Sequence, residues 1–137
     1  YTPVFKQNAI LLVPEGHPLA DKESVSIDDT LEYNHILYTK NHTLSEKLSS
    51  YLNKKECQAN ISYKTDDLGV IASLVTGDFG ISIVPENNTV NLKGVKSIEI
   101  SDLDWQNIVY MAYLKSSYEI PLINEFKKFI EEHAINL

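Results

Sequence analysis

A chain of 137 residues is long enough for one domain with a buried core, and 43% hydrophobic with 23% charged residues is typical of globular proteins. A net charge of −7 disfavours direct binding to a nucleic-acid backbone, and no apolar run approaches the roughly 18 residues of a membrane span. The single cysteine, Cys57, excludes an internal disulfide. It favours a reducing compartment, so we expect a cytoplasmic protein.

The first half of the chain predicts three strands and one helix. An apolar run at 8–14 ends in proline, as in a buried strand, and a short strand is expected at 35–38. A capping-box pattern at 43–46 starts a helix whose apolar face is formed by Leu44, Leu48, Tyr51 and Leu52. Residues 59–65 alternate as a strand, which places Ile61 and Tyr63 on the same side.

The second half predicts two more helices and three more strands. A helix starts at Thr65 or Asp66 and ends at Gly77, which is expected to adopt the left-handed conformation. Strands follow at 80–85, 94–100 and 107–114, and a last helix begins near Ser117. Because strands alternate with single helices, we expect an α/β fold with a three-layer, mostly parallel sheet and helices on both faces.

Familiar catalytic patterns are missing from the sequence. It holds neither a G-x-S-x-G nucleophile elbow nor a phosphate-binding loop, and its four histidines are never three or four residues apart. The paired carboxylates Asp28–Asp29 and Asp66–Asp67 fit helix starts better than acid–base catalysis. The sequence therefore predicts no enzyme activity, no cofactor and no metal site.

Ligands of parallel α/β sheets gather where strands end and helices begin. Two such places are expected, at 38–43 and at 65–67. The first offers hydroxyls, the Lys40 charge, the Asn41 amide and free backbone N–H groups, which together suit an anion. These residue types are also common in ordinary loops, and Thr43 is already accounted for as a helix cap.

Three segments carry a family resemblance: LLVPEGHPLA at 11–20, TDDLGVIASLVTGDFGISIVPE at 65–86, and NIVYMAYLKSSYEIPLINEFKKFIEE at 107–132. In this order, across nearly the whole chain, they resemble the effector-binding domain of LysR-type transcriptional regulators. The resemblance implies a periplasmic-binding-protein-like (type 2) lobe. It also implies that Gly77 and Gly80 serve the architecture, and that His17 is a family marker on a surface loop.

The resemblance divides residues 1–137, a partial effector-binding domain, into two parts. Residues 8–100 would form the second lobe, and 107–137 a strand and helix returning toward a first lobe that is mostly missing. Cleft contacts carried over from the family would be Tyr38, Thr39, Lys40, Asn41, His42, Thr43, Thr65, Asp66 and Asp67. Without the first lobe, the last helix would expose an apolar stripe of Ile120, Ile123, Phe126 and Phe129. It would then fold back, pair with another copy or be poorly ordered.

The expected function is sensing of a small-molecule effector, a small organic anion, by a bacterial LysR-type regulator. The parent would be a homo-oligomer, a dimer or tetramer, that binds DNA only through a helix-turn-helix domain absent from this chain, and it would not contact a membrane. One alternative is a fragment of a solute-binding protein of a transport system. Another is an enzyme on the same scaffold, such as a prephenate dehydratase-like domain, although no matching catalytic residues are found.

Overall fold

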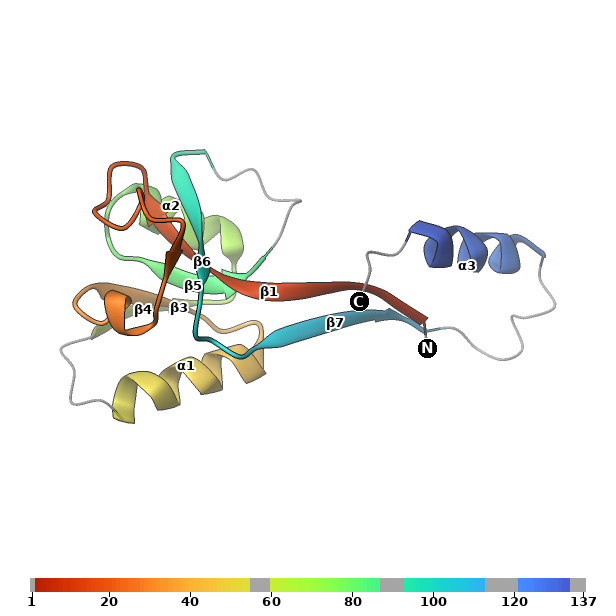
Figure 1. The fold of residues 1–137 in the computed structure, drawn as a ribbon, viewed down its shortest axis with the longest axis horizontal. Coiled ribbons are helices and arrows are strands. Elements are labelled where there is room, and N and C mark those ends of the chain that lie inside the picture. Colours follow the sequence, from red (N-terminus) through yellow and green to blue (C-terminus); the bar gives the residue numbers. More distant parts are fainter. Residues whose placement is uncertain (1, 55–59, 87–92, 113–120, 134–137) are drawn as a thin grey trace. The chain divides into compact units, whose positions relative to one another are not determined.

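The computed structural model describes residues 2–54, 60–86, 93–112 and 121–133, which form two compact units (Figure 1). The larger unit comprises 9–105, and the smaller comprises 1–8 and 106–137. Cys57 and Ser117 lie outside the described residues. Within the described residues, none of the helices is both long and apolar enough to cross a bilayer.

In the larger unit, four strands pair in the order β2-β6-β1-β5 and two more pair as β3-β4. An isolated parallel bridge between His35 and Ile81 joins the two groups into one mixed sheet. Its strands are β1 (Thr2–Pro14, from Ala9 on), β2 (Ser24–Val25), β3 (Asn34–Tyr38), β4 (Asn60–Thr65), β5 (Ser82–Pro85) and β6 (Val95–Ile100). Its helices are the 3-10 turn η1 (Asp28–Thr30), α1 (His42–Lys54) and α2 (Leu68–Thr76). The Ile36 N–H donates to the Ile81 carbonyl at 2.8 Å, which joins the β3–β4 pair to β5.

The mostly parallel sheet is confirmed with one exception, the first strand. β1 runs antiparallel to β5 and β6, whereas β2 is parallel to β6 and β3 is parallel to β4. The sheet neighbours of β1 are β5 and β6, which come much later in the chain. The direction of β1 is therefore set by long-range pairing and not by the connection that directly follows it.

Two apolar clusters, one on each face of the sheet, explain why the helices cover both sides. Leu37 packs with Leu44 and Leu48 of α1, whereas its neighbour Ile36 packs with Ile71 and Val75 of α2. Successive strand residues point to opposite faces, so β3 contributes to both clusters. All six side chains are at most 5% exposed. The predicted three-layer arrangement is therefore confirmed.

The turn between α2 and β5 corrects one prediction and explains its glycines. Gly77 has φ −77°, so it is not left-handed; Asp78, with φ 62°, takes that conformation instead. The Gly77 and Asp78 N–H groups donate to the Ser73 and Val75 carbonyls and close the helix. Gly80 has a different role, because an added Cβ would lie 2.8 Å from the Asn34 carbonyl oxygen of β3. The glycine lets the two backbones meet.

A register shift in β4 overturns a second prediction. The pairing with β3 slips between His35 and Ile36, so Ile61 and Tyr63 do not share a side. Ile61 packs against the α1-side cluster. Tyr63 is 44% exposed, and its ring meets that of Phe79 at 90° with centroids 6.1 Å apart.

The smaller unit contains a strand pair and a helix. Residues 2–8 of β1 pair antiparallel with β7 (Gln106–Met111), and the Asn107 side-chain amide donates to Gln7 Oε1 at 3.0 Å. The helix, α3 (Pro121–His133), has no buried residue. Its large apolar side chains at 122, 126 and 129 are 74%, 56% and 54% exposed. Of the predicted stripe, Ile123 is half-buried and Ile120 lies outside the described residues.

Candidate functional site

The structure brings both predicted ligand-binding loops to one edge of the sheet. β3 and β4 are parallel and in register at their ends, where Tyr38 pairs with Thr65. The Thr39 N–H donates to the Thr65 carbonyl at 2.9 Å just beyond this pair. The loop at 38–43, which leads into α1, therefore lies beside the loop at 65–67, which leads into α2. Lys40 and Asp66 consequently belong to the same edge.

Asn41 holds the start of α1, which corrects the predicted capping box. Asn41 Oδ1 accepts from the Leu44 N–H at 3.2 Å and from the Thr43 hydroxyl at 2.9 Å. Asn41 rather than Thr43 is therefore the cap. Glu46, expected to reach back to the helix start, instead pairs with His42 at 2.9 Å on an exposed surface. A pair this exposed contributes little to stability.

Trp105 supports the same loop from a distant part of the chain, and no sequence pattern predicts this contact. Its indole Nε1–H donates to Thr43 Oγ1 at 3.1 Å, and the side chain is only 8% exposed. Lys47 of α1 donates to the Asp104 carbonyl beside it. The only sequence signal for this contact is that Trp105 is the single tryptophan of the chain.

Asp67 fixes the second loop. Its carboxylate accepts from the Gly69 and Val70 N–H groups at 2.7 and 3.3 Å, so it caps α2. Its own N–H donates to Thr65 Oγ1 at 3.2 Å. The predicted start of this helix at Thr65 or Asp66 was therefore early, and the α2 amides are already occupied by a carboxylate.

The Tyr38 side chain is buried beneath this edge and is not part of its exposed surface. It is 7% exposed and packs in the α2-side cluster. Burial raises the pKa of Tyr38, and the nearby Asp66 and Asp67 carboxylates raise this pKa further. Tyr38 is therefore a neutral phenol at physiological pH.

The remaining groups are the ones available to a ligand. Thr39 and Lys40 are exposed, and within the described residues their side chains make no hydrogen bond or ion pair. The backbone N–H groups of His42 and Thr43, at the open end of α1, have no acceptor in that part of the structure either. A cation, a hydroxyl and free amides at a helix start suit an anionic group. Asp66 adds an exposed carboxylate on the other side, which suits a hydroxyl donor.

Comparison with known proteins decides the family. Residues 1–135 match the family model of the LysR substrate binding domain. The chain belongs to the LysR substrate-binding domain family. Over 130 residues, 95% of the chain, it is 25% identical to the uncharacterized HTH-type transcriptional regulator YybE of Bacillus subtilis. It is also 28% identical, over 127 residues, to the malolactic fermentation system transcriptional activator of Lactococcus lactis.

This LysR substrate-binding domain chain spans less than half the length of those regulators: 44% of YybE and 36% of the Lactococcus activator. Among solved structures, the effector binding domain of QuiR in complex with shikimate aligns with a TM-score of 0.71 and 28% identity. The alignment covers 97% of this chain and 64% of the QuiR chain. The Synechocystis CcmR regulatory domain in complex with 2-PG aligns with a TM-score of 0.73 and 14% identity. This alignment covers 99% of this chain and 67% of the CcmR chain, and it supports the fold.

Proposed function

We propose that this chain is the small-molecule effector-sensing part of a bacterial LysR-type transcription regulator, and that the effector binds at the edge formed by residues 38–43 and 65–67. One observation carries this proposal: two loops 22 or more residues apart in sequence are joined by the Thr39–Thr65 hydrogen bond at the carboxyl ends of parallel strands. Membership of the LysR substrate-binding domain family supports the same edge.

The proposed ligand is a small organic anion. Lys40 supplies charge, and the His42 and Thr43 N–H groups and the Thr39 hydroxyl supply hydrogen bonds. Asn41, Thr43, Thr65 and Asp67 hold the loops in place, and Tyr38 is buried beneath them. The QuiR effector domain, 28% identical over nearly the whole chain, binds shikimate, which makes shikimate a suitable first probe.

In the whole protein, we propose, the ligand changes the closure of two lobes and thereby the packing of a homo-oligomer. That change would alter the spacing of helix-turn-helix domains on DNA. The curated relatives are transcriptional regulators, which favours this function over a solute-binding protein of a transport system. The proposal includes a cytoplasmic location and no catalytic activity.

The test is a titration of shikimate and other small carboxylates into a complete two-lobed effector domain containing this chain, followed by calorimetry and amide NMR. We expect shifted resonances at 38–43 and 65–67. Lys40→Gln should weaken binding about 5- to 10-fold, because one charge at contact distance is worth about 1 kcal/mol in water. Lys96→Gln removes the same charge from an exposed position on β6 and serves as the matched control.

Two results would refute the proposal. The first is an equal loss of affinity in Lys40→Gln and Lys96→Gln, since binding would then respond to net charge alone. The second is a set of ligand-shifted amides confined to other parts of the domain. The 137-residue chain by itself should bind more weakly than the two-lobed domain, because the other lobe would supply further polar contacts; equal affinity would contradict that part.

A further inference from the structure

The larger unit has a cavity of about 480 Å³ at the edge of the sheet opposite to the candidate effector site. Three connections form it: the loop after β1, the segment before β3 and the turn after α2. Their contributing side chains include Glu15, His17, Tyr33, Thr76 and Asp78. Its volume lies within the range of small-molecule sites.

The two edges are joined by the same two elements. β3 runs from Asn34, beside the cavity, to Tyr38 at the candidate effector site. α2 runs the other way, from its Asp67 cap to Thr76 in the cavity wall. At about 3.3 Å per strand residue and 1.5 Å per helix residue, each element spans about 13 Å. The cavity is therefore a separate site and not an extension of the first.

His17 has a fixed place in the cavity wall. Its Nδ1 accepts from the Leu19 N–H at 3.1 Å, so the proton of the neutral ring lies on Nε2. Its ring meets that of Tyr33 edge-on, with centroids 4.6 Å apart. Burial lowers the pKa of His17, and the Asp78 and Glu32 carboxylates partly oppose this. The wall thus presents a neutral imidazole and a phenol ring.

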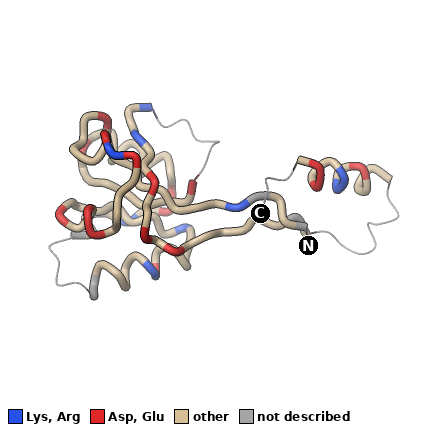
Figure 2. The backbone as a smooth tube through the Cα atoms, viewed as in Figure 1, with Lys and Arg blue, Asp and Glu red and all other residues tan. Residues whose placement is uncertain are grey.

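The charged groups of the lining are all acidic. Glu15 and Asp78 line the cavity, and no lysine or arginine does. Within the described part of the chain, neither carboxylate makes a side-chain hydrogen bond or a salt bridge. Figure 2 shows acidic residues in the loops of this unit. Pro14, Pro18 and the Tyr33 ring add apolar surface, so the cavity combines negative charge with an aromatic wall.

We propose that this cavity binds a small organic cation, an amine with a compact apolar or aromatic body. The ammonium group would pair with the carboxylates of Asp78 and Glu15, and the body would lie against Tyr33 and the prolines. A carboxylate and an aromatic face are the two protein groups that attract an ammonium ion most strongly. This site would recognise the opposite charge from the one expected at the 38–43 edge.

Benzylamine is the test probe, with benzyl alcohol and benzoate as neutral and anionic controls of the same shape. Calorimetry and NMR of the protein should show benzylamine binding about tenfold or more tightly than either control. The backbone amides at 15–17, 33 and 76–78 should shift; Pro14 and Pro18 carry no N–H. The bound ammonium should also lower the pKa of the His17 imidazole further, since a nearby positive charge disfavours its protonation.

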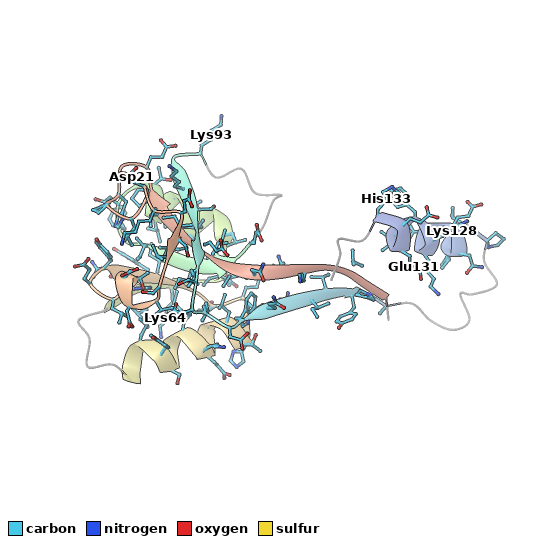
Figure 3. All side chains as sticks on the ribbon, viewed as in Figure 1. Asp21, Lys64, Lys93, Lys128, Glu131 and His133 are labelled. Carbon is cyan, nitrogen blue, oxygen red and sulfur yellow. The ribbon has the colours of Figure 1, made fainter. Side chains whose placement is uncertain are left out.

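The matched variants are Asp78→Asn and Asp21→Asn. Asparagine tolerates the left-handed backbone of residue 78, so Asp78→Asn removes the charge without straining the turn. This variant should bind benzylamine about tenfold more weakly than the wild type. Asp21→Asn changes an exposed carboxylate outside the cavity lining (labelled in Figure 3) and should leave the affinity unchanged.

Equal affinity for benzylamine and benzyl alcohol would overturn the proposal, and this comparison needs no variant. An equal loss of benzylamine affinity in Asp21→Asn and Asp78→Asn would also overturn it. Ligand-induced amide shifts confined to the 38–43 edge would do the same. None of these results depends on an effector binding at that edge, so failure here and failure of the proposed function can be told apart.

Discussion

Gly80→Ala tests whether the glycine turn exists to let two backbones touch. An added Cβ would lie 2.8 Å from the Asn34 carbonyl oxygen and 3.2 Å from Ile36 Cγ1. The first of these atoms cannot move freely, because the same carbonyl accepts from the Ile81 N–H at 2.9 Å. Gly77→Ala is the matched control. Its Cβ would lie 2.9 Å from Phe79, a side chain that is 53% exposed and can shift toward solvent more easily than a backbone carbonyl can.

The expected magnitudes follow from these contacts. Overpacking costs about 1–3 kcal/mol, and replacing glycine by alanine recovers about 0.4–1 kcal/mol by restricting the unfolded chain. Gly80→Ala should therefore lower the free energy of unfolding by about 1–2 kcal/mol. Gly77 has φ −77°, which alanine accepts, so Gly77→Ala should stay within about 0.5 kcal/mol of the wild type.

Urea denaturation followed by circular dichroism measures both variants, and unchanged m-values confirm that only stability differs. An equal loss of unfolding free energy in the two variants would show that the turn as a whole limits stability, and not the close contact between the Gly80 backbone and β3. A Gly80→Ala protein as stable as the wild type would refute the reasoning, because the strands would then separate at no cost.

Three further predictions concern a helix cap, a buried histidine and the last helix. Asp67→Ala should lower the free energy of unfolding in urea by about 1 kcal/mol, because it leaves two α2 amides unpaired. Asp67→Asn should lower it less, and an equal loss of stability in both variants would contradict the capping role. Burial lowers the pKa of His35 below 6.5, so the folded state binds protons less readily than the unfolded state. Stability should therefore fall as pH drops below 6.5, and His35→Gln should flatten this dependence; an unchanged slope would be the contrary result. Phe126 and Phe129 are each more than half exposed. Replacing both by serine should reduce the concentration-dependent association seen in sedimentation without lowering the stability of the fold. A wild-type protein that is monomeric at all concentrations would contradict this prediction.

The candidate site was located from the sequence better than its internal contacts were. The positions of the two strand–helix junctions follow from hydrophobic periodicity, and parallel strands bring such junctions to one edge. Which side chain caps α1 does not follow from periodicity. Asn41 and Thr43 are both good caps, and the indole of Trp105 engages the Thr43 hydroxyl from 62 positions away. Whether any of these residues contacts an effector stays a prediction.

The sequence by itself determined the α/β class, the helices on both faces and the family. These properties depend on local repeats of apolar residues and on short motifs, which neighbouring residues specify together. Only the tertiary structure decided the antiparallel direction of β1, the slip that separates Ile61 from Tyr63, and the left-handed conformation at Asp78 instead of Gly77. The first two are set by hydrogen bonds and packing between segments far apart in the chain, and a local pattern carries no information about such partners. The third depends on how the last turn of α2 closes its own hydrogen bonds, which apolar periodicity does not specify.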